Sequence, residues 1–147
     1  PTLPNGKHRG LWIRPGRENI DTIEQLLSTY QRLGLQDLYL ETYYQGQTVY
    51  PSNWMQQYKL SEQHPQYRGH DPIQTWISLA HQHNLKVHAW MQVFFAGNQE
   101  SNIETFGPVL TQYPQWRNVR KSDWQNPMPH PSKMEPGHFF LDPANPE

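Results

Sequence analysis

Residues 71–98, DPIQTWISLAHQHNLKVHAWMQVFFAGN, predict a helix followed directly by a strand. Asp71 is a good N-cap, Gln74 completes a capping box with it, and Asn84 suits a left-handed C-cap. Between these caps the apolar side chains recur at helical spacing: Ile73, Trp76, Ile77 and Ala80. A strand is therefore expected to begin directly after Asn84.

The two faces of this strand differ in chemistry. One face is apolar and carries Leu85, Val87, Ala89, Met91 and Val93. The other face is polar or aromatic and carries Lys86, His88, Trp90 and Gln92. A strand with helices on its apolar side and such groups on the other side is typical of a (β/α) barrel, in which inward side chains near the carboxyl ends of the strands form the active site.

Three other segments repeat this alternation: residues 8–14 (HRGLWIR), 35–44 (LQDLYLETYY) and 137–143 (GHFFLDP). Their apolar faces are expected to point outward, toward helices. Their inward positions are Trp12, Arg14, Tyr39, Glu41, Tyr43, Phe140 and Asp142. Each inward face thus becomes polar or aromatic toward the end of its strand.

Helices are predicted between the strands. The first has a capping box from Asp21 to Glu24 and ends at Gly34. Its apolar stripe consists of Ile20, Ile23, Leu26, Leu27, Tyr30 and Leu33. A shorter helix is expected over residues 103–113, stopped by Pro114. The order β-α-β-α-β-α-β indicates parallel strands joined by right-handed crossovers.

The predicted fold class is therefore α/β, of the (β/α) TIM-barrel type. A complete (β/α)8 barrel takes about 250 residues, whereas this chain has 147 residues with about four strands. We expect residues 1–147 to be the N-terminal half of a barrel domain, truncated at the C-terminus, with four parallel strands in the order 1-2-3-4. Its inner face would be exposed, which predicts self-association through this face or through the edge of the fourth strand.

Composition excludes several functional classes. The formal net charge is −1 and no basic run occurs, so no nucleic acid is expected as a partner. No apolar run approaches the roughly 18 residues of a membrane helix, so no membrane insertion is expected. The chain has no cysteine, which excludes disulfides and thiolate catalysis. Its histidines lack metal-ligand spacing and it has no G-x-S-x-G nucleophile motif, so neither a metal nor a cofactor nor a serine triad is predicted.

Seven short motifs occur in an order that resembles a known family. They are HRGLWI, ETYYQGQTVYPS, DPI with AH further on, LKVHAW, FFAGN with Asn102 following, GPVL with PQW, and FFLDPANPE. The chain resembles the glycoside-hydrolase-like family related to family 10 glycosidases, formerly a domain of unknown function, which includes bacterial envelope enzymes acting on peptidoglycan glycan strands. The resemblance covers nearly the whole chain and implies a TIM-barrel hydrolase of β-linked polysaccharide. The chain departs from the family in length, because the later strands with an Asp-rich motif of the DGIHFDDY kind do not occur in it.

A glycan site requires aromatic platforms bordered by carboxylates, amides and arginine, because sugar rings offer apolar faces edged by hydroxyl groups. The candidate substrate-binding residues are Arg14, Tyr43, Tyr50, Trp54, His88, Trp90, Gln92 and Asn98. Each has a structural alternative, since inward aromatic residues also fill the packed layers of a barrel. Tyr50 and Trp54 lie in the polar stretch 45–70, where they would either bind substrate or anchor the loop.

The candidate catalytic residues are Glu41 and Asp142, which lie at predicted carboxyl ends of strands. Glycosidases usually employ two carboxyl groups. Glu41 has the alternative of an ion pair with Arg14 or of hydrogen bonds to substrate. Asp142 has the alternative of capping the next helix, because Pro143 follows it.

Two functions remain. The first is part of a glycoside hydrolase that acts on a β-linked bacterial polysaccharide such as peptidoglycan glycan strands, with this segment inactive alone. The second is a non-catalytic carbohydrate-binding or scaffold domain on a barrel fold. The resemblance favours a location in the cell envelope or outside the cell.

Overall fold

The computed structural model describes residues 8–98, 106–119, 125 and 137–144, which form two compact units. The first unit comprises residues 1–42, 49–51 and 63–91, and the second comprises residues 43–48, 52–62 and 92–147. Each unit has its own strands and its own apolar core, so each is described by itself.

A parallel sheet forms the first unit. Strand β1 (Gly10–Ile13) pairs in parallel with β2 (Asp37–Tyr44), with Gly10 opposite Asp37 and Ile13 opposite Leu40. Strand β4 (Lys86–Met91) pairs with the other edge of β2. The N–H of Lys86 donates to Gln36 O at 2.8 Å, and further along Thr42 Oγ1 donates to Trp90 O at 3.2 Å. Strand β4 therefore runs parallel to β2, and the first three predicted strands are parallel as expected.

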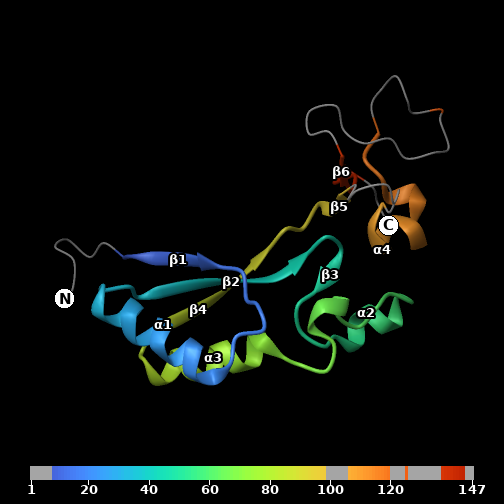
Figure 1. The fold of residues 1–147 in the computed structure, drawn as a ribbon. Helices are drawn as coiled ribbons and strands as arrows, with labels where there is room; N and C mark the ends of the chain where they lie inside the picture. Colours follow the sequence, from blue (N-terminus) through green and yellow to red (C-terminus); the bar gives the residue numbers. More distant parts are fainter. Residues whose placement is uncertain (1–7, 99–105, 120–124, 126–136, 145–147) are drawn as a thin grey trace. The chain divides into compact units, whose positions relative to one another are not determined.

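Helices α1 (Ile20–Arg32) and α3 (Pro72–Gln82) cover one face of this sheet, as Figure 1 shows. The side chains between helices and sheet are almost completely buried: Ile23, Leu27, Leu38, Leu40, Trp76, Ala80 and Leu85. These are the apolar positions that the alternation predicted. Burial of such side chains is the main favourable term for this unit.

The caps at Asp71, Asn84 and Gly34 agree with the predictions, whereas the Gln74 side chain donates to Ser78 Oγ at 3.1 Å and no described bond closes the predicted capping box. Asp71 Oδ1 accepts a hydrogen bond from the N–H of Gln74 at 3.0 Å, and Asn84 is left-handed with φ 55°. Gly34, with φ 75°, ends α1 as expected. The predicted capping box at Asp21 is wrong, because Asn19 is the N-cap and its Oδ1 accepts from Thr22 N at 2.8 Å. The N-cap thus lies two residues earlier in the chain than predicted, where the backbone is extended and the amide oxygen accepts from a free N–H of the first turn.

The stretch 45–70, predicted as a long polar loop, contains short ordered elements. Strand β3 (Gln47–Thr48) pairs antiparallel with the end of β2, and helix α2 (Asn53–Gln57) follows it. A 3₁₀ turn, η2 (Pro65–Tyr67), lies in the first unit. There the buried Gln63 amide donates to Val49 O at 2.8 Å and to His70 O at 2.7 Å.

The fourth predicted strand does not join the parallel sheet. Strand β6 (His138–Phe140) pairs antiparallel with β5 (Phe95–Asn98) in a separate two-stranded sheet of the second unit. The expected parallel order 1-2-3-4 is therefore wrong for this strand. Phe139 packs with Ala96 and Leu110 instead, since alternation shows which side of a strand is apolar but not which strand lies beside it.

The third predicted helix is shorter than expected. Helix α4 (Gly107–Gln112) is followed by the turn η3 (Pro114–Trp116), and residues 103–105 lie outside the described residues. Gly107, with φ 79°, begins α4 directly against Ala96, where a Cβ would lie 1.9 Å from the Ala96 oxygen. Only glycine fits this contact.

The predicted apolar face of β4 is covered only at its beginning. Leu85 is buried, but Ala89 and Met91 are exposed, and Val93 lies beyond the end of the strand and is also exposed. The sequence predicted that Ala89, Met91 and Val93 share the apolar face, but it did not predict that they are exposed to water.

Substitution of Gln63 by leucine tests the order of the 45–70 stretch. The change should leave the carbonyls of Val49 and His70 without their donor and should lower the unfolding free energy by about 2 kcal/mol. Urea denaturation measures this loss. The matched variant Gln66→Leu changes an exposed glutamine in the adjacent turn η2 and should alter stability by less than about 0.5 kcal/mol. Equal effects of the two variants would show that the Gln63 hydrogen bonds do not hold the segment.

Candidate functional site

The sheet face opposite α1 and α3 carries a continuous stack of rings across three strands. The Trp12 and Tyr39 ring centroids lie 4.9 Å apart at an interplanar angle of 20°, and those of Tyr39 and His88 lie 4.9 Å apart at 22°. The parallel register places Trp12 beside Tyr39. Gly10 makes room for the middle ring, because a Cβ there would lie 2.7 Å from Tyr39 Cε2.

At the amino ends of the strands, two histidines hold one carboxylate. Asp37 Oδ2 lies 3.1 Å from His8 Nδ1, and Asp37 Oδ1 lies 2.9 Å from His88 Nε2. The hydrogen bond to His88 lowers the pKa of the Asp37 carboxyl below its ordinary value, with a smaller contribution from His8, although desolvation opposes both. Asp37 thereby fixes the ring of His88 against Tyr39.

At the carboxyl ends, Arg14 and Glu41 form a bidentate ion pair. The Arg14 Nε donates to Glu41 Oε2, and Nη2 donates to Oε1 at 3.0 Å. The carboxylate is completely buried, whereas 58% of the Arg14 side chain is exposed. The guanidinium carbon also lies over the Trp90 ring, 6.0 Å from its centroid. The Arg14 guanidinium is thus held at the rim of the sheet by the Glu41 carboxylate, and it lies over the ring of Trp90.

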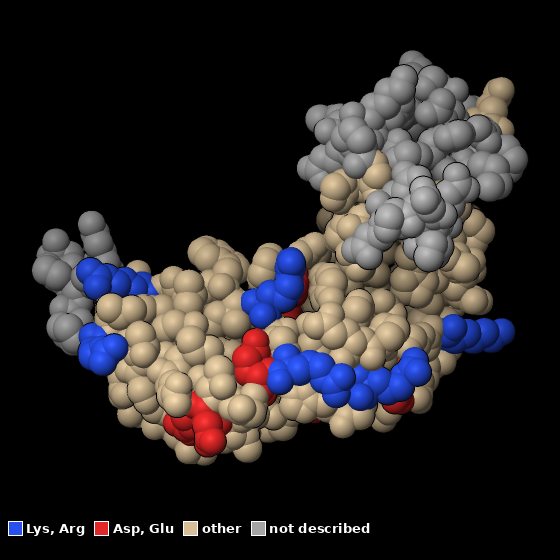
Figure 2. Space-filling view, viewed as in Figure 1, with Lys and Arg blue, Asp and Glu red and all other residues tan. Residues whose placement is uncertain are grey.

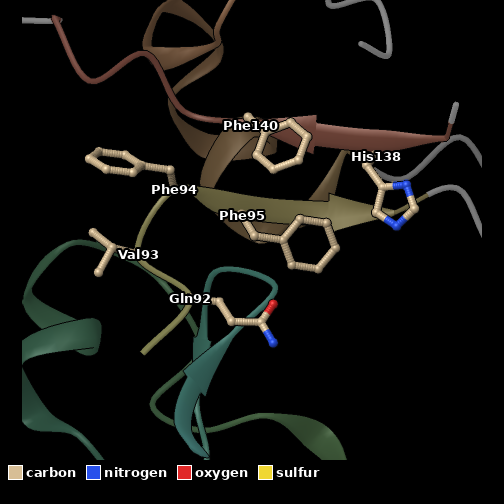
Figure 3. Close-up of a pocket in the computed structure, with 6 residues that line it drawn as sticks. All are labelled: Gln92, Val93, Phe94, Phe95, His138 and Phe140. Atoms are coloured by element: carbon tan, nitrogen blue, oxygen red, sulfur yellow. The ribbon is translucent and has the colours of Figure 1, made fainter. Parts of the chain in front are cut away.

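The second unit contains a pocket of about 430 Å³ where the chain leaves β4 and enters β5 (Figure 3). The lining residues are Gln92, Val93, Phe94, Phe95, His138 and Phe140. Phe95 lies at the centre of this group, with ring centroids 5.5 Å from His138 and 5.8 Å from Phe140. The pocket is therefore mainly aromatic, with an amide and an imidazole at its wall.

The other candidate binding residues lie in separate places. In the second unit, Asn98 Oδ1 accepts from Gln45 Nε2 at 2.9 Å, and burial raises the pKa of the Tyr43 hydroxyl. Trp54 lies on α2 with 69% of the residue exposed. Tyr50 belongs to the first unit and is half-buried.

Asp142 caps a turn at the end of the described segment. Its Oδ1 accepts from Ala144 N at 2.9 Å, and its own N–H donates to Trp116 O at 2.8 Å. The prediction that Asp142 ends a strand of the parallel sheet is wrong, because its strand is antiparallel to β5. The capping alternative accounts for its observed contacts.

The structure brings three of the predicted site residues together at the carboxyl ends of the first unit's strands, namely Arg14, Glu41 and Trp90, whereas His88 contacts Asp37 and Tyr39 instead. Gln92, Asn98, Tyr43, Trp54 and Asp142 belong to the second unit. Asp37 was missed by the sequence reasoning, although it lies two residues before Tyr39 and therefore on the same face. That spacing was the available signal.

In the view of Figure 2, basic and acidic side chains lie next to one another in the middle of the face, and most of the remaining described surface is uncharged. Within the described part of the chain, no helix has the length and apolarity needed to cross a membrane.

A parallel β/α sheet with an arginine, a carboxylate and aromatic rings at the strand ends suits the class of TIM-barrel glycosidases. The chain belongs to the glycosyl hydrolase-like 10 family, whose sequence profile matches residues 8–147. This confirms the resemblance on which the fold class rests, while the described residues themselves show a partial sheet and no closed barrel.

Curated relatives support the same assignment. Glycosyl hydrolase DigH of Escherichia coli strain K12 is 27% identical over 135 residues, covering 87% of this chain and 27% of the relative. The protein of the same name from Shigella flexneri gives the same values. The chain thus spans about a quarter of the length of these relatives.

The lowered pKa of Asp37 predicts a pH dependence of stability. The carboxylate form is favoured in the folded state, so its contribution is fully present above its ordinary pKa of about 4 and is lost as the pH falls through the lower folded pKa. The variant Asp37→Asn should therefore be less stable than the wild type at pH 6, and the difference should shrink toward pH 2. Thermal melts of both proteins across this range measure it. A difference that is independent of pH would contradict the role of the charge.

Proposed function

We propose that this chain forms part of a glycoside hydrolase that acts on a β-linked bacterial polysaccharide such as the glycan strands of peptidoglycan. The observation that carries the proposal is the row formed by Glu41, Arg14 and Trp90 at the carboxyl ends of parallel strands, beside the ring stack. Active sites of barrel enzymes lie at this end of the strands. Membership in a glycosyl hydrolase-like family agrees with it.

The side chains on this face of the sheet suit contact with a sugar. Trp12, with 63% of the residue exposed, offers an apolar ring surface for the face of a pyranose, whereas Tyr39 is covered by Trp12 on one side and His88 on the other. The exposed guanidinium of Arg14 offers N–H donors in one plane for oxygens at the ring edge. His88 is the last ring of the stack, and its Nε2 lies 2.9 Å from Asp37 Oδ1.

Glu41 acts as a positioning residue in this proposal. Both of its oxygens accept hydrogen bonds from Arg14, and it has no exposed surface. A general acid or nucleophile must reach the glycosidic bond, which a carboxylate in this position does not do. The alternative that the sequence left open, an ion pair with Arg14, is the one that the geometry favours.

The contacts of Glu41 and Asp142 also support the second candidate function, a non-catalytic carbohydrate-binding domain. Glu41 is committed to Arg14, and Asp142 caps a turn. Hydrolysis needs one carboxyl group that protonates the leaving oxygen and a second carboxylate or an activated water. We therefore propose that the 147 residues bind glycan but do not cleave it alone, and that the catalytic pair includes residues beyond them.

Glycan binding is predicted at the carboxyl ends of the first unit. Titration with amino-sugar oligomers from chitin or peptidoglycan should shift the indole N–H signal of Trp90 in a heteronuclear NMR spectrum. The variant Trp90→Ala should weaken binding about tenfold, because one aromatic contact is lost. Trp54→Ala is the matched control in the second unit and should weaken binding less. Shifts confined to His8 and Lys86, at the amino ends, would show that the site is assigned to the wrong end.

The role of Asp142 is tested in any form of the protein that cleaves the glycan. If Asp142 only caps the turn, Asp142→Asn should lower stability by about 1 kcal/mol or less and leave the turnover rate nearly unchanged. If Asp142 is catalytic, the rate should fall at least a hundredfold with little change in melting temperature. Rate and melting temperature are measured on the same preparation, so that the two outcomes are distinguished. Robust cleavage by the 147-residue chain would contradict the proposal that it is inactive alone.

A further inference from the structure

Helix α2 and the residue that follows it carry two large aromatic side chains outside the first unit's site. Trp54 and Tyr58 are 69% and 52% exposed, and none of the residues of α2 is buried. Residues four apart on a helix lie on the same side, and the N–H of Tyr58 donates to Trp54 O at 3.4 Å. Both side chains therefore extend from one face of the helix, and both present a large part of their surface to solvent.

Two further rings lie next to the end of this helix. The Tyr113 and Trp116 ring centroids lie 4.2 Å apart at an interplanar angle of 10°. The Tyr113 hydroxyl donates to Tyr58 O at 2.8 Å, which joins this stacked pair to the end of α2. All four residues belong to the second unit, and we name them the aromatic surface.

The segments that carry the aromatic surface have no charge. Residues 53–58 and 107–116 include no acidic or basic side chain and no histidine. Apart from the tyrosines, their exposed polar side chains are amides or a hydroxyl group: Asn53, Gln56, Gln57, Thr111, Gln112 and Gln115. Aromatic rings beside neutral polar groups complement a pyranose, which has an apolar face edged by hydroxyl groups. They do not complement a nucleic acid or an anionic membrane, which require basic side chains.

The size of the aromatic surface favours a glycan over a protein partner. A stable protein interface buries about 800 Å² on each partner. A completely buried aromatic side chain contributes about 150–250 Å², and the rings of Tyr113 and Trp116 already cover one another. The exposed parts of Trp54 and Tyr58 therefore supply only a fraction of a protein interface, whereas a sugar ring needs no more than one or two aromatic contacts.

We propose that the aromatic surface is a second glycan-binding site, which holds neutral β-linked sugar units against Trp54 and Tyr58. This inference rests on the proposed function for the kind of ligand, but it goes beyond that function because it places a separate site in the second unit. None of its residues takes part in the contacts of Arg14, Glu41 and Trp90. The second site binds the polymer independently of the first unit's site.

Chitotetraose, a neutral β-linked tetramer of an amino sugar, is the probe. When it is added to the 147-residue chain, the indole N–H signal of Trp54 should shift in a heteronuclear NMR spectrum. The signal of Trp76, which is buried in the first unit, should stay in place. The variant Trp54→Phe assigns the signal. In Trp90→Ala the dissociation constant reported by Trp54 should remain within about twofold of its wild-type value, because independent sites do not couple.

Two matched variants assign the site to the aromatic surface. Tyr58→Ala should weaken the affinity reported by Trp54 about fivefold, because one of two exposed ring contacts is lost. Phe94 is also half-exposed and belongs to the same unit, but it lines the pocket beside β5. Phe94→Ala should therefore leave the affinity at Trp54 unchanged. Melting temperatures confirm that each variant is folded.

Each outcome decides the proposal. A shift of Trp90 without a shift of Trp54 would overturn the second site and leave the proposed function standing. Loss of the Trp54 shift in Trp90→Ala, or equal losses in Tyr58→Ala and Phe94→Ala, would also overturn it. A Trp54 shift without a Trp90 shift would support the second site and contradict the proposed site of the first unit, and no shift at either residue would contradict both. A Trp54 signal that moves with protein concentration in the absence of sugar would show that a second copy of the chain covers this surface, which would overturn the proposal.

Discussion

The parallel pairing of β1 with β2 is the constraint on which the candidate site depends. The register aligns Trp12 with Tyr39 on the open face while Leu38 and Leu40 point into the core beneath the helices. Because side chains alternate along a strand, the burial of these leucines places Tyr39 and Glu41 on the opposite face. A slip of one residue would exchange the two faces, so the apolar core and the site are fixed together.

The buried carboxylate of Glu41 gives this arrangement its chemistry. A charge without exposed surface is costly unless it is paired, and the bidentate contact with Arg14 provides the pairing. The consequence lies at the surface, where the guanidinium is held in one orientation next to Trp90. At the other end of the same strands Asp37 fixes His88 in a similar way, against the ring of Tyr39. The open face is thus ordered by two carboxylates that are themselves shielded from solvent.

The sequence predicted those features that depend on neighbouring positions along the chain. The cap at Asp71 and the left-handed Asn84 follow from short spacings, and the structure confirms them, whereas the predicted apolar face of β4 is buried only at Leu85. The N-cap of α1 was misassigned, because Asn19 and Asp21 both suit the position and only the backbone of Asn19 is extended. The partner of residues 138–140 was not predictable, since an alternating pattern suits a parallel barrel strand and a small antiparallel sheet equally well. Asp37 was overlooked because its role depends on two histidines distant in sequence.

The central claim is that the carboxyl ends of β1, β2 and β4 bind a sugar. A crystal structure of the chain soaked with a cell-wall oligosaccharide tests it most directly. We expect a sugar ring against Trp12 and a sugar oxygen within hydrogen-bond distance of the Arg14 guanidinium. A sugar bound only at the amino ends, against His8 and Asp37, would show that the proposed site is wrong.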